Sequence, residues 1–152
     1  QGLETDTNLT YNPSTNVLST TASQAQYADL AEVYAADSEY EIGTIVKLGG
    51  SAEITQTVSA NDADVFGVVS ENPAYLMNSK AQGIPVALTG RVRVKIIGPV
   101  AKGQRIVSSS IPGVGTAVNN EKIGNILTIV GRALESSVDH NEKLVECAVG
   151  KL

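Results

Sequence analysis

The feature that most restricts how this chain can fold is a series of short strand-like runs separated by turn-forming clusters. Runs rich in Val, Ile, Leu and Thr lie near residues 44–48, 65–70, 84–88, 91–97, 105–108, 126–134 and 144–149. Clusters of Gly, Pro, Asn and Asp lie between them, for example ANDAD at 60–64 and IPGVG at 111–115. Short strands at this spacing are typical of β-sandwiches and barrels. The sequence therefore predicts an all-β fold, a compact antiparallel sandwich or barrel-like domain.

Composition limits the core and the partners of this domain. Apolar residues make up 42% of the 152-residue chain, but aromatic residues make up only 4% and Trp is absent. The core must therefore be built from Val, Ile, Leu and Ala. The net charge of −5 argues against a broad phosphate-binding surface, so we expect no nucleic-acid partner. No run approaches the roughly 20 apolar residues that cross a bilayer, so we expect no membrane insertion.

Residues 1–25 are polar, and we interpret them as an extended N-terminal arm. Within the arm, residues 9–11 and 17–20 are strand-like and flank a turn with Pro13, which predicts a β-hairpin. A two-stranded hairpin is only marginally stable alone in water, so we expect this one to rest on another surface, such as a second chain. The β-rich domain then covers 26–152. At its start, residues 26–36 fit both helical and strand spacing, and the period alone does not decide between them.

A weak internal sequence similarity divides the β-rich domain into two parts. The segment IGTIV at 42–46 resembles KGQRIV at 102–107, and a glycine-containing strand follows each of them, FGVVS at 66–70 and VGRALES at 130–136. Two related β-units packed together would bury a shared core, which predicts units at about 41–76 and 101–136. The alternative is coincidence, because Gly-x-x-Val is common in any β-protein.

Asp29 and Glu32 form an Asp-x-x-Glu pair beside Tyr27 and Tyr34. On a helix this spacing places both carboxylates on one face, where each raises the proton affinity of the other and the pair is suited to general acid and base chemistry. On a strand the same spacing separates them. The alternative is a capping or solvated pair, since surface carboxylates are mostly solvated.

Three cations, Arg91, Arg93 and Lys95, alternate with aliphatic residues in RVRVKI at 91–96. A period of two places the cations on one face of a strand. Such a face suits an anionic glycan or the acids of a neighbouring subunit. The alternative is an ordinary strand whose outer face is solvated.

The sequence contains few residues or motifs that bind a metal or a cofactor. Its one cysteine, Cys147, lies in the strand-like run VECAV and is predicted to be a core residue. Its one histidine, His140, lies in a polar turn and is predicted to be solvated. One Cys and one His do not complete a structural zinc site. The sequence also contains no P-loop, dinucleotide fingerprint or nucleophile elbow, so we expect neither metal nor cofactor.

Several segments, taken in order, resemble one known family. They are YADLAEVY, EIGTIVKLGG, FGVVSENPAYLMN, VALTGRVRVKIIGPVAKGQRIVSS, IPGVGTA and IVGRALES, between about residue 27 and the end of the chain. Together they resemble the C-terminal β-domain of bacteriophage tail fibre and appendage proteins, the type called peptidase G2 or intramolecular chaperone autoprocessing domain. The stretch LTYNPSTNVLST at 9–20 resembles hairpin repeats of phage fibre shafts.

The resemblance implies a trimeric virion protein at the end of a tail fibre or appendage, or one that decorates the capsid. Its partners would be its own copies, other virion proteins and host-surface glycan. In some members the domain assists trimer assembly and then cuts itself off just before the Asp of the Asp-x-x-Glu motif. The matching residues here are Asp29 and Glu32, and the bond is Ala28–Asp29.

One departure from the family pattern weighs against cleavage. Ala28 occupies the position where a self-cleaving member carries Ser, so a hydroxyl that attacks its own peptide bond is missing. We therefore expect a structural protein rather than an enzyme, with self-cleavage before Asp29 as the alternative. In the structural case, Asp29 and Glu32 would accept hydrogen bonds from backbone N–H groups. They would otherwise pair with Arg91 or Arg93 of the same or a neighbouring subunit.

Overall fold

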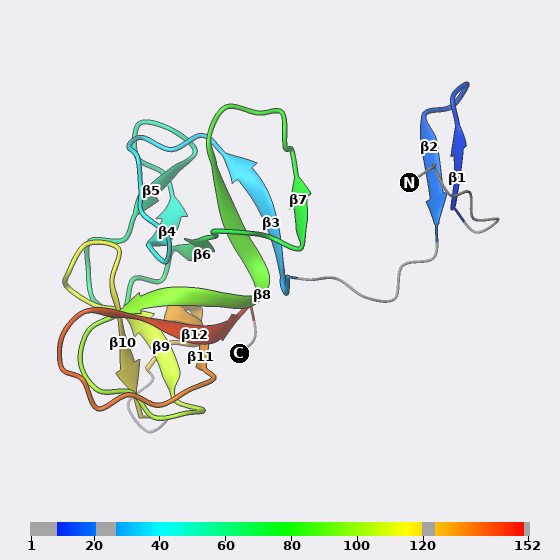
Figure 1. Ribbon diagram of the computed structural model, residues 1–152. Helices are drawn as coiled ribbons and strands as arrows, with labels where there is room; N and C mark the ends of the chain where they lie inside the picture. The colour runs from blue at the N-terminus through cyan, green and yellow to red at the C-terminus, as the bar shows by residue number, and fades with distance from the viewer. Residues whose placement is uncertain (1–8, 21–26, 120–123, 151–152) are drawn as a thin grey trace.

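The structure is a computed structural model that describes residues 9–20, 27–119 and 124–150. The fold of these residues is nearly all β, as the sequence predicts (Figure 1). The strands form a two-stranded hairpin and a separate ten-stranded sheet that curls into a barrel-like body.

The hairpin is the one that the sequence predicts. Its strands are β1 (Leu9–Asn12) and β2 (Val17–Thr20), and they are antiparallel. Residues within the turn stabilise it, because Oδ1 of Asn12 accepts a hydrogen bond from the N–H of Ser14 at 3.0 Å. Asn16 has a φ of 55°, a left-handed conformation that Asn tolerates well. The turn is therefore encoded locally.

Among its described residues, the body contains ten strands and one 3-10 turn. In chain order they are β3 (Asp29–Tyr34), β4 (Ile45–Leu48), β5 (Ile54–Gln56), β6 (Val65–Val69), β7 (Tyr75–Met77), β8 (Ile84–Ile96), β9 (Arg105–Ser108), β10 (Gly115–Val118), η2 (Ile126–Thr128), β11 (Ile129–Ala133) and β12 (Lys143–Val149). Along the sheet the order is β10-β9-β11-β12-β8-β6-β4-β5, and β3 pairs with both β8 and β7.

The structure differs from the expected strand positions in ways that have local reasons. The runs 84–88 and 91–97 are one strand, β8, because Gly90 carries the backbone through the junction with a φ of 115°. The run 126–134 begins with the turn η2, where the side chain of Asn125 accepts a hydrogen bond from the N–H of Leu127. Residues 26–36 contain the strand β3 rather than a helix. β5, β7 and β10 were not expected, and β5 and β7 have only three residues each, too few to show an alternation.

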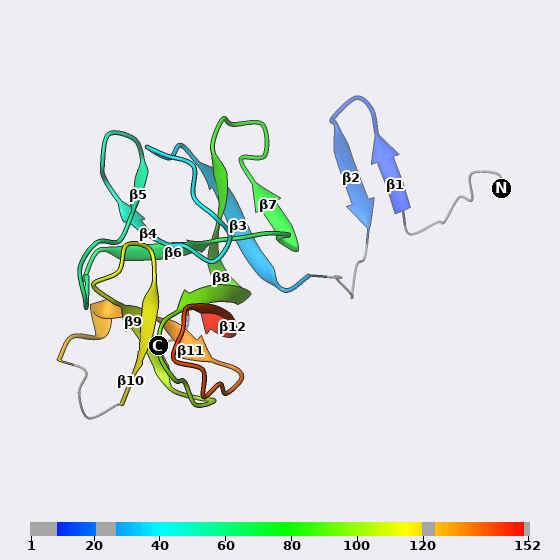
Figure 2. The same cartoon turned by 60° about the vertical axis from the view of Figure 1, so that its left-hand side comes forward.

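β8 spans 13 residues and joins the two halves of the body. Its first half pairs with β3 and β6, and its second half pairs with β12. At its end, Ile96 pairs with Gly115 of β10, which closes a ring formed by β8, β12, β11, β9 and β10 (Figure 2). One strand therefore connects the start of β3 to the closed part of the sheet.

Two clusters of buried aliphatic side chains form the core, as the composition predicts. The larger cluster joins the strands of the ring and includes Val94, Ile96, Ile106, Val145 and Cys147. The smaller cluster is formed by Val46, Ile54, Val69 and Val86. Against the smaller cluster, the rings of Tyr34 and Phe66 meet edge to face with their centroids 5.1 Å apart. The few aromatic residues therefore contribute at the margin of the core rather than at its centre.

The two predicted β-units have the same strand pairing. In the first, β4 pairs with β5 on one side and β6 on the other, and in the second, β9 pairs with β10 and β11 in the same way. The glycines of the similar segments FGVVS and VGRALES occupy matching positions, because Gly67 lies opposite Val46 and Gly131 lies opposite Ile106. In both units a register shift accompanies the pair.

The hydrogen bonds at the start of each unit also match. The N–H of Gly43 donates to the carbonyl of Val69 at 2.9 Å, and the N–H of Gly103 donates to the carbonyl of Ala133 at 2.8 Å. Both glycines have positive φ angles, 84° and 88°. The division into units at about 41–76 and 101–136 stays a prediction, and the shared pairing supports it.

Candidate functional site at the start of β3

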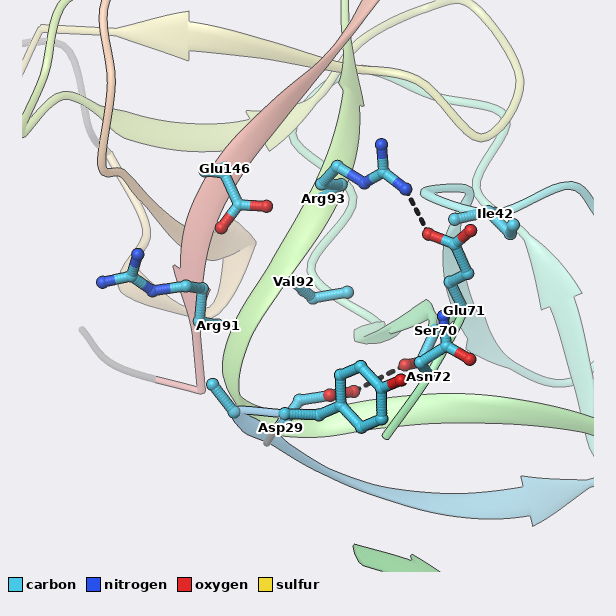
Figure 3. Close-up of a pocket in the computed structure, with 11 residues that line it drawn as sticks. Asp29, Ile42, Ser70, Glu71, Asn72, Arg91, Val92, Arg93 and Glu146 are labelled. Atoms are coloured by element: carbon cyan, nitrogen blue, oxygen red, sulfur yellow. Dashed lines mark hydrogen bonds and ion pairs between the residues drawn. The ribbon is translucent and has the colours of Figure 1, made fainter. Parts of the chain in front are cut away.

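A pocket of about 280 Å³ lies where β3 begins (Figure 3). Its charged side chains and its Ser hydroxyl come from β3, from the residues after β6, from β8 and from β12, and they are Asp29, Ser70, Glu71, Arg91, Arg93 and Glu146. The pocket thus gathers three of the predicted site residues, Asp29, Arg91 and Arg93. Glu32 and Lys95 do not line it.

Asp29 is the buried carboxylate of this pocket. Asp29, Ala31 and Val33 alternate as the buried face of β3, and the Asp29 residue is only 5% exposed. Its Oδ2 accepts a hydrogen bond from the hydroxyl of Ser70 at 2.6 Å. A short bond of this kind is typical of a hydroxyl that donates to an ionised carboxylate. Asp29 is therefore buried together with a hydrogen-bond partner, as a buried carboxylate requires.

The peptide bond between Ala28 and Asp29 is held against β8. The carbonyl of Ala28 accepts a hydrogen bond from the N–H of Arg91 at 3.1 Å, and the carbonyl of Asp29 accepts one from the N–H of Ala74 at 2.9 Å. Gly90 makes this approach possible, because a Cβ there would lie 2.3 Å from the carbonyl oxygen of Ala28. The bond that the family resemblance marks is thus fixed by backbone contacts on both sides.

Glu32 lies on the opposite face of β3 from Asp29. Since β3 is a strand, a spacing of three places the two side chains on opposite faces. Glu32 Oε2 accepts a hydrogen bond from the hydroxyl of Tyr34 at 2.8 Å. Burial, with help from this bond and from the charge of Glu32, raises the pKa of Tyr34 to about 12. The two carboxylates therefore do not form a shared-proton pair within the chain.

The predicted ion pairs of these carboxylates with Arg91 or Arg93 are not formed within the chain. The partner of Asp29 is the hydroxyl of Ser70, and the partner of Glu32 is the hydroxyl of Tyr34. Ser70 could not be identified as this partner from the sequence, because it lies 41 residues from Asp29 and belongs to no local motif. Pairing of β6 and β3 with the same strand, β8, brings the two residues together.

The cations of the basic stripe, Arg91, Arg93 and Lys95, alternate with the buried Val92, Val94 and Ile96, as the period of two predicts. Two of these cations form ion pairs with acidic residues of the same chain. Arg93 forms an ion pair with Glu71, and Lys95 Nζ lies 2.6 Å from Oε2 of Glu41.

These ion pairs neutralise part of the positive charge that the stripe would offer to an anionic partner. The hydrogen bond from Lys95 holds the pKa of Glu41 below its usual range. Glu146 lies directly opposite Arg93 on β12, and Arg91 forms no ion pair with any described residue. Exposed pairs of this kind are worth roughly 0–1 kcal/mol. Contact of the stripe with host-surface glycan stays a prediction, and Arg91 is its least neutralised member.

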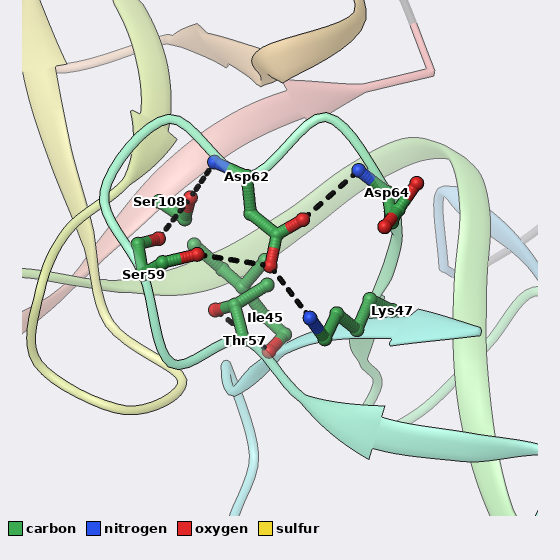
Figure 4. A network of polar contacts seen from close by, with 7 residues as sticks. All are labelled: Ile45, Lys47, Thr57, Ser59, Asp62, Asp64 and Ser108. Atoms are coloured by element: carbon green, nitrogen blue, oxygen red, sulfur yellow. Dashed lines mark hydrogen bonds and ion pairs between the residues drawn. The ribbon is translucent and has the colours of Figure 1, made fainter. Parts of the chain in front are cut away.

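A second polar cluster surrounds Asp62, which lies in the turn-forming segment ANDAD at 60–64 (Figure 4). Asp62 is 8% exposed, and its Oδ2 contacts Lys47 Nζ at 2.9 Å and the hydroxyl of Ser59 at 3.3 Å. Its Oδ1 accepts the N–H of Asp64 at 3.0 Å, and its own N–H donates to Oγ of Ser108 at 2.8 Å. The hydrogen bond from Lys47 lowers the pKa of Asp62, against the opposing effect of burial. These bonds fasten the loop before β6 to β4 and β9.

The remaining candidate groups are placed as structural residues. Cys147 is buried and 0% exposed, as predicted, and burial raises the pKa of its thiol to about 12. His140 is exposed in the loop before β12. Within the described ranges, no group of three or more His, Cys, Asp or Glu residues is arranged to hold a metal ion. In the same ranges, no helix is long and apolar enough to cross a membrane.

No protein-family model matches this sequence, and no curated protein matches it. The resemblance to the phage domain therefore rests on the ordered segments of the sequence.

Proposed function

We propose that this chain is a structural domain of a bacteriophage virion, a trimeric tail fibre or appendage domain or a capsid decoration, which acts through contacts with its own copies and other virion proteins. The ordered sequence resemblance motivates the proposal. The all-β body with a hairpin-bearing arm is compatible with it. Attachment to host-surface glycan would be a secondary role.

The observation that carries the proposal is the uncovered face of the hairpin. Antiparallel pairing places Leu9, Tyr11 and Leu18 on one face, because Tyr11 lies opposite Leu18 and Leu9 is two residues from Tyr11. These side chains are 53%, 58% and 62% exposed. The hairpin forms a sheet of its own and pairs with no other described strand. Because such a hairpin is marginal alone, this apolar face is best explained by contact with another chain.

The test is the mass of the full chain in solution, measured by sedimentation equilibrium at micromolar concentrations. We expect three times the mass of one chain. A variant with Leu9→Ser, Tyr11→Ser and Leu18→Ser should dissociate, whereas a control with Thr10→Ser on the opposite face should keep the parent mass. A parent chain that is monomeric and folded at these concentrations would contradict the proposal.

A second candidate function is self-cleavage at the Ala28–Asp29 bond. The observation in its favour is that this bond borders the pocket and that a buried carboxylate, Asp29, contacts a hydroxyl, Ser70, beside it. The alanine at 28 and the position of Glu32 on the other face weigh against it. Intact mass of a chain extended at its N-terminus distinguishes the cases. One full-length species, unchanged in Glu32→Ala and Asp29→Asn, would exclude cleavage.

A further inference from the structure

The outer edge of β7 carries backbone groups that pair with no described strand. β7 pairs only with β3 among the described strands, in parallel, with Leu30 beside Tyr75. The N–H of Ala74 donates to the carbonyl of Asp29, so the backbone groups of Ala74 face β3. Backbone groups of successive strand residues alternate in direction, and Tyr75 and Met77 therefore direct their N–H and C=O groups away from β3. This edge is a template for another strand.

A large side chain at this edge is also uncovered. Tyr75 is 66% exposed, and Met77, two residues further, lies on the same face of β7. An aromatic ring at an open edge offers apolar area to a neighbouring strand in addition to the backbone groups. The edge therefore combines a backbone template with a side chain that a cross-strand neighbour would cover.

The hairpin has the complementary properties. β1 and β2 pair only with each other, so each has one outer edge without a partner among the described strands. Tyr11 and Leu18 lie on the apolar face, and both are more than half exposed. In the structure of one chain, the hairpin and β7 belong to separate sheets. Their unpaired edges are thus both available to another copy.

We propose that a hairpin strand of a second copy of this chain pairs with the outer edge of β7 and extends the sheet formed by β8, β3 and β7. This inference rests on the self-association argued under the proposed function and names its contact. The contact joins two different surfaces, so it is heterologous and is able to close a ring of three copies. Pairing of β7 with a second β7 would join only two copies. Strand addition of this kind draws its affinity from main-chain hydrogen bonds.

Cysteine cross-linking tests the contact directly. A chain with Tyr75→Cys is mixed with a chain carrying either Tyr11→Cys or Leu18→Cys, and the mixture is oxidised. We expect a covalent product of two chains in at least one mixture and none with either chain alone, because the native Cys147 is buried. When both cysteines are placed on one chain, a disulfide that leaves the chain monomeric would show that the hairpin pairs with its own β7. That result would overturn the proposal.

A backbone variant tests the edge without a cross-link. Met77→Pro removes an outward N–H group and leaves the pairing with β3 in place, while Met77→Leu keeps the N–H and a similar side-chain volume. We expect Met77→Pro to weaken association at least tenfold and Met77→Leu to change it less than twofold, measured by sedimentation equilibrium.

The outcomes separate the two proposals. If the parent chain is monomeric, both the proposed function and this contact fail. If the parent associates and the hairpin-face variant dissociates, but Met77→Pro associates like the parent and no cross-link forms through Tyr75→Cys, only this contact fails. If Met77→Pro does not fold, the cross-linking result decides alone.

Discussion

Asp29 is a charged residue that the fold buries together with its partner. In water a carboxylate is fully solvated, and the transfer of an unpartnered one into the body would cost several kcal/mol. The hydroxyl of Ser70, at 2.6 Å, replaces part of that solvation. The interaction joins the first residue of β3 to the residue that follows β6. It is therefore a link between distant parts of the chain rather than a local cap.

A double-mutant cycle measures this link. We expect Asp29→Ala and Ser70→Ala each to lower the free energy of unfolding by about 1–3 kcal/mol, the range for a lost hydrogen bond to a charged group. The double variant should lose less than the sum, since the two residues share one interaction. Urea unfolding of the four proteins gives the coupling, and Glu32→Ala on the opposite face of β3 is the control for loss of a carboxylate that does not contact Ser70. Strict additivity would show that the contact contributes nothing.

Asp62 makes the stability of the loop before β6 dependent on pH. Because Lys47 holds the folded-state pKa of Asp62 below its value in the unfolded chain, the folded state binds the proton less readily. The resulting stabilisation is complete above the unfolded value, about 3.9, and is lost as the pH falls through the folded value.

Asp62→Asn should therefore be less stable than the parent at pH 6, and the difference should shrink toward pH 3. We expect about 1–3 kcal/mol at pH 6, from the lost charged hydrogen bonds. Urea unfolding at the two pH values measures it. Asp64→Asn is the matched control, because the side chain of Asp64 is exposed and only its N–H takes part in the cluster. A difference that is equal at both pH values would refute the assignment.

At the scale of elements, β3 and β8 meet closely enough that one residue must lack a Cβ. Gly90 has a φ of 115°, and an added Cβ would lie 2.3 Å from the Ala28 carbonyl oxygen and 2.7 Å from Cα of Asp29. Both contacts are with backbone, which does not move aside without shifting β3. Gly90 thus allows the pairing that forms the pocket.

A comparison of Gly90→Ala with Gly98→Ala distinguishes the energetic cost of close packing from that of backbone strain. Gly98 also has a positive φ, 81°, but no atom lies within 4 Å of a Cβ placed there. Gly98→Ala should cost about 1–2 kcal/mol, the penalty of a left-handed conformation. Gly90→Ala should cost clearly more, because β3 must also move. Equal losses in thermal or urea unfolding would show that the close approach does not matter.

At the scale of the whole molecule, two units with the same pairing order are joined through β8 and β12. The second unit closes a ring together with β8 and β12, because β10 meets the end of β8. The buried Cys147 lies in β12 between them and reports on the integrity of the assembled body.

Thiol labelling uses Cys147 as such a reporter. Burial raises its pKa to about 12, so the thiolate that reacts is scarce in the folded chain at pH 8. We expect only very slow reaction with a disulfide reagent under native conditions and complete reaction in guanidinium chloride. Because labelling follows the population of the open form, the native rate should rise exponentially with the stability lost in Gly90→Ala, about tenfold for each 1.4 kcal/mol. Rapid labelling of the folded parent would show that the body opens locally around β12.

The sequence by itself determined the features that depend on neighbours along the chain. The hairpin follows from its strand-like runs and its Asn- and Pro-containing turn, and the alternation of Arg91, Arg93 and Lys95 follows from a period of two. The all-β class and the aliphatic core follow from the strand spacing and the composition. Each of these depends on local dihedral preference and on which side chains leave water, and both can be read from a short segment.

Only the tertiary structure decided the relations between segments that are distant along the chain. Spacing left Asp29 and Glu32 open to a helix or a strand, and pairing with β8 made the segment a strand and separated the two carboxylates. The same pairing brought Ser70 to Asp29 and joined two predicted strands into β8 through Gly90. Contacts of this kind depend on sheet register and on burial between residues far apart in sequence, and no local period encodes either.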